Sequence, residues 1–154
     1  MSKFIKNKGD NLVFNLNELE LLEAWHDNDY TKRWKACLPL MKEFPFWVGV
    51  EAKTLSVVYF EIEPGNALGE HTDSAEEIVL VLSGSAEAII CEEVTDLNEG
   101  KMVIIPEMAS HSIKNTGNET VKCIGFYSKP VVTSTFKEVM QPLGVKSVGP
   151  QIKE

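Results

Sequence analysis

Residues 65–84 read GNALGEHTDSAEEIVLVLSG, and this stretch decides the fold. His71 and Asp73 are two positions apart, so on an extended strand their side chains point to the same face. Glu77 follows after a short connection and begins the apolar run EIVLVL. Strand alternation predicts that Glu77 points into the interior together with the valines of this run, whereas Glu76 faces solvent. The stretch therefore predicts two strands that carry metal-ligating side chains into a buried interior.

A second stretch, residues 100–115, reads GKMVIIPEMASHSIKN and places another histidine at the start of a strand. His111 follows a turn that begins with a proline, and the apolar run before that turn predicts a further strand. Of the three histidines in the chain, only His26 lies outside these two stretches. We expect His26 to lie at the surface or in a segment that wraps the sheet, and not to bind a metal.

Short apolar runs follow one another throughout residues 55–128, and turn residues such as glycine, asparagine and proline separate them. Strands with a turn signal every 8–12 residues, roughly, are typical of an all-β sandwich or barrel. No apolar run in this region has the length and spacing of a helix, which argues against alternating strands and helices. The region therefore predicts an all-β fold.

The flanking regions differ from this pattern. Residues 12–25 place leucines and Trp25 near helical spacing, with Asn15 or Asn17 available as the N-cap, so we expect a helix there. After residue 129 the chain contains three prolines and is expected to run over the surface, with one helical turn near 134–140. A chain of 154 residues is sized for one domain. Within that single domain, residues 1–154, we distinguish an N-terminal helical and wrapping segment (1–54), a barrel (55–128) and a C-terminal tail (129–154).

The composition excludes several classes of function. The formal net charge is −8 and there is a single arginine, so a phosphate backbone would be repelled and nucleic-acid binding is excluded. No apolar run approaches the roughly 20 residues of a membrane span, and the amino terminus lacks the apolar segment of a signal peptide, so we expect a cytoplasmic protein. The three cysteines form no CxxC pair and are expected to be buried, reduced thiols.

The two histidine-containing stretches resemble the paired motifs of the cupin family, G-x5-H-x-H-x3,4-E-x6-G and G-x5-P-x-G-x2-H-x3-N. The positions that match at the right spacing are Gly65, His71, Glu77, Gly84, Gly100, Pro106, His111 and Asn115. Two positions depart from the motifs: Asp73 stands where the family has its second histidine, and Met108 stands where it has glycine. The chain thus resembles a small single-domain cupin of the cupin 2 type.

The resemblance implies an all-β jelly-roll barrel, also called a double-stranded β-helix, that holds one divalent transition metal per chain. Similar family members bind the metal with three histidines and one glutamate. Here the corresponding residues are His71, Asp73, Glu77 and His111. Imidazole and carboxylate donors without cysteine suit Fe(II), Mn(II), Zn(II), Co(II) or Ni(II). Asp73 is expected to be either a metal ligand or the catalytic base, since a carboxylate beside a cation stays ionised. Loss of the glycine at Met108 predicts a different turn before His111.

Two histidines with one or two carboxylates resemble the ligand set of non-haem iron oxygenases, which implies a mononuclear metal-dependent dioxygenase acting on a small molecule. The alternatives are a non-catalytic small-ligand-binding cupin, with a structural metal or none, and a sugar isomerase or epimerase. The scarcity of arginine disfavours the isomerase because phosphate recognition usually recruits forked donors. An oxoglutarate-dependent enzyme shares the H-T-D pattern but would need a basic residue after His111, where only lysines are available. Tyr59, Phe126 and Tyr127 are candidates for lining the substrate site.

Members of the family resemble one another in forming dimers, so a homodimer is expected. The apolar residues 12–25 and the aromatic residues 44–50 are the candidate contacts. A DNA-sensing regulator is not expected, because no helix-turn-helix pattern is attached to the barrel.

Overall fold

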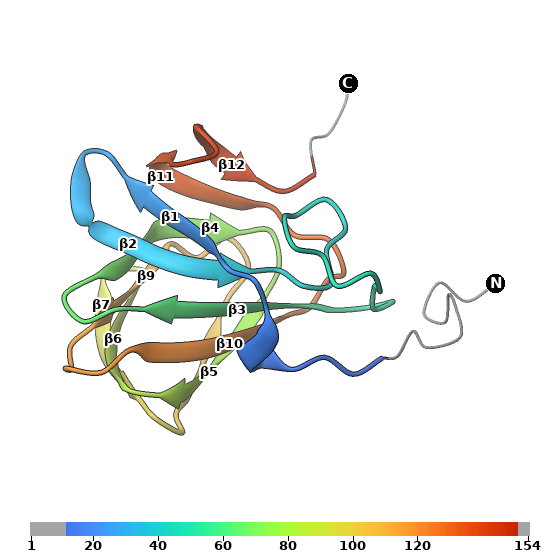
Figure 1. Ribbon diagram of the computed structural model, residues 1–154. Helices are drawn as coiled ribbons and strands as arrows, with labels where there is room; N and C mark the ends of the chain where they lie inside the picture. The colour runs from blue at the N-terminus through green and yellow to red at the C-terminus, as the bar shows by residue number, and fades with distance from the viewer. Residues whose placement is uncertain (1–11, 151–154) are drawn as a thin grey trace.

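Twelve β-strands and one short 3-10 helix make up residues 12–150, the part of the chain that the computed structural model describes (Figure 1). In chain order the elements are η1 (Leu16–Glu18), β1 (Leu22–His26), β2 (Asp29–Cys37), β3 (Ser56–Ile62), β4 (Ala67–Asp73), β5 (Glu77–Ser83), β6 (Ser85–Ile90), β7 (Glu93–Asn98), β8 (Met102–Ile105), β9 (His111–Asn115), β10 (Val121–Tyr127), β11 (Ser134–Met140) and β12 (Val145–Val148). The prediction of an all-β fold is confirmed. Within the described residues, no helix is long and apolar enough to cross a membrane.

The strands form one nearly closed barrel with two halves (Figure 1). One half has the order β1-β2-β3-β10-β5-β8, and the other has the order β12-β11-β4-β9-β6-β7. A parallel bridge between Lys32 of β2 and Ala67 of β4 and an antiparallel bridge between Trp25 and Gln141 join the two halves, and the other strand pairs are antiparallel. This arrangement is the jelly-roll barrel that the motifs predicted.

The barrel interior is filled from both halves by alternate residues of each strand. Along β5, Glu77, Val79 and Val81 are buried, whereas Ile78 and Leu82 are exposed. This alternation follows from the two-residue period of a strand, and β-branched residues suit such a half-buried surface. The predicted inward face of β5 is therefore confirmed, and Glu77 is the only carboxylate on it.

The helix predicted over residues 12–25 is wrong. Only η1 is helical, although Asn15 does cap it by accepting a hydrogen bond from the backbone N–H of Asn17 at 2.9 Å. Leu22–His26 instead form β1, which pairs with β2 as an antiparallel hairpin. Ala24 and His26 are buried along β1 and Glu23 is exposed, so the alternation of a strand overrides the approximate helical spacing of the leucines.

The C-terminal residues also belong to the barrel and do not form the predicted surface tail with a helical turn. Residues 134–140 form β11, which pairs with β4 so that Ser134 lies opposite Asp73 and Phe136 lies opposite His71. Phe136 and Met140 are buried. Long-range pairing with β4 therefore decides the conformation of this segment, and it brings new side chains next to the predicted ligands.

The turn before His111 keeps the backbone shape that a glycine would favour. Met108 has a φ of 63°, and its backbone N–H donates a 2.9 Å hydrogen bond to the carbonyl oxygen of Asp73. The side chain of Met108 is 59% exposed, so it meets no obstacle. The predicted change of turn is thus not observed: a non-glycine residue adopts the left-handed conformation, and the turn ties the two motifs together.

The three cysteines are free, but they differ in burial. Cys37 and Cys123 are buried as predicted, and burial raises their thiol pKa values to about 11 and about 12. Cys91 is exposed in the turn between β6 and β7, so the prediction of a buried thiol is wrong there. A turn position at the end of a strand is open to solvent even when the strand before it is apolar.

Candidate metal centre

The predicted site residues come together at one end of the barrel interior, from three strands. His71 and Asp73 lie on β4, Glu77 begins β5, and His111 begins β9. His71 and His111 are directly opposite each other in the antiparallel pair of β4 and β9. All four side chains are almost completely buried, with 6% exposure or less. The spacing of the two motifs therefore did identify side chains that meet in space.

Both histidine rings are oriented by the backbone. His71 Nδ1 donates to the carbonyl oxygen of Gly69 at 2.7 Å, and His111 Nδ1 donates to the carbonyl oxygen of Ala109 at 2.9 Å. The Nε2 atom of each neutral ring then carries the lone pair. Such backbone acceptors are typical of metal-ligating histidines, because they hold the ring and select the tautomer.

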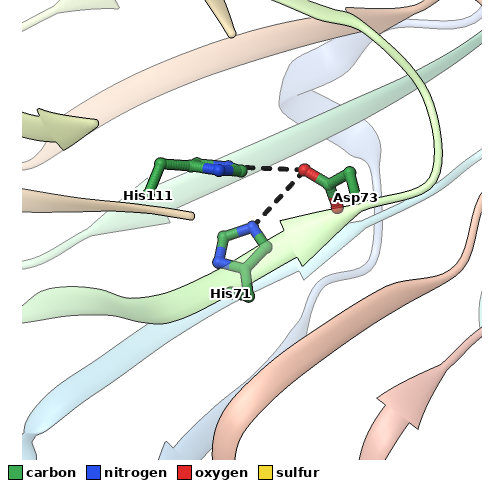
Figure 2. Close-up of side chains that lie close together, drawn as sticks. All are labelled: His71, Asp73 and His111. Atoms are coloured by element: carbon green, nitrogen blue, oxygen red, sulfur yellow. Dashed lines mark ion pairs between the residues drawn. The ribbon is translucent and has the colours of Figure 1, made fainter. Parts of the chain in front are cut away.

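Asp73 lies beside the two histidines, and one of its oxygens faces both of them (Figure 2). Its Oδ2 atom is 3.3 Å from His111 Nε2 and 3.6 Å from His71 Nε2. Its other oxygen, Oδ1, accepts a 2.5 Å hydrogen bond from the hydroxyl of Ser134. Oδ2 is buried and has no hydrogen-bond partner, the one buried side-chain polar atom of this kind in the described residues. A buried anionic oxygen without a partner is costly, so a positively charged occupant is expected beside it.

The distances of Asp73 Oδ2 from the two Nε2 atoms, 3.3 and 3.6 Å, are close to the spacing of neighbouring metal ligands. Two ligands about 2.1 Å from one ion are roughly 3.0–3.4 Å apart when they are neighbours. The donor atoms of His71, Asp73 and His111 all lie within 4.8 Å of one another. Because two imidazoles and one carboxylate converge in a buried place, this group of three can hold one metal ion.

Glu77 lies at the side of this group. Its Oε1 atom is 3.7 Å from His111 Nε2. The carboxyl group rests over Gly125 of β10, where a Cβ atom would overlap it. The glycine therefore makes the space that Glu77 occupies beside the group of three donors.

Three side chains of the centre, His71, Asp73 and Glu77, have pKa values shifted from their usual range. Burial, and then the neighbouring His111, lower the pKa of His71 to about 4. Burial also raises the pKa of Glu77 well above its usual range, and the nearby charge of Asp73 adds to this. For Asp73, burial acts in the same direction, but the nearby His71 and His111 and the hydrogen bond from Ser134 outweigh it and lower the pKa. The site therefore favours a neutral His71 beside an ionised Asp73, which is the state in which these two side chains bind a cation.

Three side chains of the site were not found from the sequence, namely Ser134, Phe136 and Trp34. Ser134 and Phe136 lie on β11, and the ring of Phe136 stacks on His71 with a 4.7 Å centroid distance. Trp34 stacks in turn on Phe136 at 5.3 Å. These residues belong to no motif. The pairing of β11 with β4 brings Ser134 and Phe136 to the site, and Trp34 reaches it from β2.

His26 is buried, so of the two predicted positions, the surface or a wrapping segment, the surface is wrong. Its Nδ1 donates to the carbonyl oxygen of Val139 at 2.8 Å, and its ring packs against Trp34 and Phe136. It does not belong to the group of donors around Asp73, as predicted. His26 therefore packs behind the centre and is held by a backbone carbonyl.

A cavity of about 60 Å³ opens beside the centre inside the barrel. His71, Glu77, His111 and Tyr127 line one end of it. The predicted role of Tyr127 as a lining residue is confirmed. Tyr59 and Phe126 do not line it, because they point to the outer face of their strands, where Phe126 is 41% exposed.

Comparison with known proteins gives the same fold. The sequence pattern of the cupin domain matches residues 58–127. Similar solved structures include an oxalate decarboxylase from Lactobacillus farciminis in complex with formate, with a TM-score of 0.64 and 23% identity over 86% of this chain and 39% of that chain. A protein from Acidithiobacillus ferrooxidans described as a sugar phosphate isomerase gives a TM-score of 0.58 and 20% identity over 87% and 81% of the two chains.

A third similar structure is a salicylate 1,2-dioxygenase from Pseudaminobacter salicylatoxidans, with a TM-score of 0.51 and 15% identity over 62% of this chain and 26% of that chain. At these identities the likeness concerns the fold alone, and the chain spans well under half of the decarboxylase and the dioxygenase. No curated protein sequence matches the chain. The motif match and the barrel agree, so this chain contains a cupin domain and folds as a cupin.

Proposed function

We propose that this protein binds one divalent transition metal through His71, Asp73 and His111, with Glu77 as the fourth donor, and acts as a mononuclear dioxygenase on a small molecule. The observation that carries the proposal is the buried, unpartnered Oδ2 atom of Asp73 between the two histidine Nε2 atoms. An uncompensated carboxylate oxygen in the interior is explained by a cation that balances it.

The geometry supports Asp73 as a ligand and not as a base. Its Oδ1 is engaged by the hydroxyl of Ser134, and its Oδ2 faces the histidines. Asp73 is also absent from the side chains that line the cavity. A base must lie within hydrogen-bonding reach of the substrate proton, and Asp73 has no oxygen directed there.

A metal held by these residues would supply open coordination positions for a substrate and dioxygen. The protein supplies the access: His71, Glu77 and His111 face the cavity, so a molecule inside it lies against the donor side chains. The apolar side chains around the rest of the cavity exclude water, which protects a reactive substrate from side reactions.

The alternatives are less well supported by the cavity. A sugar phosphate isomerase is among the similar structures, but phosphate recognition needs cationic donors. No lysine or arginine of the described chain lines the cavity. A non-catalytic binding module would keep the metal in a closed site, without exchangeable positions.

The test uses nitric oxide as a stand-in for dioxygen. Protein loaded with Fe(II) under anaerobic conditions is expected to bind nitric oxide and give the electron paramagnetic resonance signal of a high-spin iron–nitrosyl centre. Asp73→Ala is expected to lose the iron and the signal, whereas Thr72→Ala, the half-buried neighbour on the other face of β4, keeps both. Iron-loaded protein that gives no nitrosyl signal would indicate that the protein is the non-catalytic binding module. An Asp73→Ala variant that keeps its full iron content would refute the assignment of Asp73 as a ligand.

A further inference from the structure

The cavity has two unlike ends. The side chains of the metal centre form one part of its lining, and apolar side chains from β2, β3, β11, β12 and the connection after β2 contribute to the rest. The apolar lining residues outside the two motifs include Leu38, Phe44, Phe60, Met140 and Val148, and Trp34 lines the cavity next to Phe136 at the metal centre. A volume of about 60 Å³ holds only a few water-sized groups, since one water needs roughly 10–15 Å³ by the same measure. The ligand that fits is small and has an apolar body.

The charges around the cavity favour an uncharged ligand. In the described residues, the ionisable side chains that line it are His71, Glu77, His111 and Tyr127, and none of them is a lysine or arginine. Asp73 does not line the cavity, but its Oδ2 atom lies close to the Nε2 atoms of both lining histidines. An anion that enters such a site must lose its hydration, and no cationic side chain replaces that hydration.

The same conclusion follows from the balance of charge when a metal is bound, and this step rests on the proposed function. A divalent ion together with the carboxylates of Asp73 and Glu77 has no net charge. A neutral ligand preserves this balance, whereas a carboxylate or phosphate adds a buried negative charge that no other side chain of the lining offsets. We propose that the substrate is a small uncharged molecule, with an oxygen donor directed at the centre and an apolar body against the apolar lining residues such as Phe60.

The experiment compares two probes of the same shape and different charge. The neutral probe is 2-hydroxy-3-methylbutanamide, and the anionic probe is 2-hydroxy-3-methylbutanoate. Binding to Mn(II)-loaded protein is measured from the paramagnetic relaxation of the probe protons. The amide is expected to bind at least about tenfold more tightly, although free metal ions favour the carboxylate. Equal or tighter binding of the carboxylate, or binding of neither probe at millimolar concentration, would overturn the proposal.

Two variants locate the probe. Ala36→Leu adds volume to the apolar wall and is expected to weaken binding of the amide without loss of manganese. Lys35→Leu places the same side chain at the neighbouring position of β2, where Lys35 is 43% exposed, and is expected to change nothing. If Ala36→Leu binds the amide as the wild type does, the cavity is not the binding site.

The measurements distinguish a failure of this charge inference from a failure of the proposed metal site. Manganese content is measured first, and a protein that takes up no metal contradicts the proposed function alone. The same two probes are then compared on the metal-free protein by saturation-transfer NMR, where the amide is again expected to bind in preference. A protein that holds manganese but prefers the carboxylate contradicts the charge inference alone.

A second inference rests on a different observation, the outer face of β5, β8 and β10. Six large apolar side chains lie there in two rows across the strands. Strand register aligns Ile104 with Ile78 and Phe126, and Met102 with Leu80 and Ile124. Four of them are 37–66% exposed, which amounts to roughly 400 Å² of apolar surface. No charged side chain interrupts the two rows.

We infer that a second copy of this chain covers the face. A standard interface buries about 800 Å² per partner, so the rows would form its apolar centre. Glu76 lies at one end of the face and Lys122 at the other. A two-fold axis across the strands therefore places Glu76 of each copy opposite Lys122 of the other, and two-fold symmetry is the commonest in homo-oligomers. The sequence had suggested residues 12–25 and 44–50 as contacts, and this face is a different one.

Light scattering tests the assignment. The wild type is expected to be a dimer at micromolar concentration and Ile104→Glu a monomer, with Val94→Glu as the control because Val94 is 61% exposed on the other half of the barrel. Glu76→Lys is expected to weaken the dimer, and the double variant with Lys122→Glu to restore it. A monomeric wild type, or a dimeric Ile104→Glu variant, would overturn the inference.

Discussion

The two ends of the barrel cavity are built from different parts of the chain. The end at the metal centre is lined by His71, Glu77 and His111. Glu77 and His111 are the first residues of β5 and β9, and His71 lies two residues before the end of β4. The opposite end uses side chains from β2, the connection after it, β11 and β12, all outside the two motifs. Metal binding at one end thus depends on the exact geometry of the donor atoms. Selection of the ligand at the other end depends on the volume of the cavity and on the absence of charged side chains from its wall.

The largest effect is expected from removing a donor at the metal end. His111→Ala should lower metal affinity by more than about 100-fold, because the ring contributes the Nε2 atom nearest to Asp73 Oδ2. Metal content of the purified variant, measured by elemental analysis, is the check. Ser112→Ala, the half-buried neighbour on the other face of β9, should retain the metal. Full metal content in His111→Ala would show that the site assignment is wrong.

The pH dependence of stability should also distinguish the metal end. In metal-free protein the pKa of His71 is lowered to about 4 from its ordinary 6.5, so between these values the unfolded chain binds more protons than the folded protein. The stability that His71 contributes is therefore complete above about pH 6.5 and is lost as the pH falls toward 4. Over this interval the wild type should lose about 3 kcal/mol more than His71→Asn in urea unfolding. Parallel curves for the two proteins would contradict the expected titration.

A smaller effect is expected from Ser134, which orients Asp73 without facing the group of donors. Ser134→Ala frees Oδ1 of Asp73, and metal affinity should fall by about 10–100-fold, as is usual for the partners of metal ligands. Competition with a chelator measures the change. Thr135→Ala, the exposed neighbour on β11, serves as the control. Unchanged affinity in Ser134→Ala would mean that strand pairing alone holds Asp73 in place.

The smallest effect is expected at the apolar end. Met140→Leu nearly conserves volume, so the free energy of unfolding should change by less than about 1.5 kcal/mol. Metal affinity should stay the same, because Met140 is not among the donors. Thermal unfolding and metal titration are the two measurements. A loss of metal affinity in this variant would show that packing at the apolar end affects metal binding. The two ends could then no longer be treated as independent.

The sequence was most informative where local periodicity and motif spacing coincide. Strand alternation placed Glu77 correctly inside the barrel, and the motif spacing placed His71, Asp73 and His111 correctly together. It failed at Leu22–His26 and Ser134–Met140, which form strands because of their pairing with β2 and β4. The pairing of β11 with β4 joins residues distant in sequence, which no local pattern reports, whereas β1 pairs with the next strand of the chain in a hairpin.

The same distinction holds for individual side chains. Among the three aromatic candidates for the cavity, only Tyr127 lines it, because adjacent residues of a strand cannot both face inward and Phe126 takes the outer face. The register of β10 against β3 and β5 decides which of the two is inside. Sequence alone predicted that alternate residues of this strand face inward, but not which of the two sets does.

By itself, the sequence determined the all-β class, the motif residues and the donor types, since these depend on residue identity and on the two-residue period of a strand. The tertiary structure decided which oxygen of Asp73 faces the histidines, because that depends on the hydroxyl of Ser134 on a strand 61 residues away. It also decided the shape and neutrality of the cavity, to which β2, β11 and β12 contribute. A metal centre needs donors at defined distances in three dimensions, and only long-range strand pairing sets those distances.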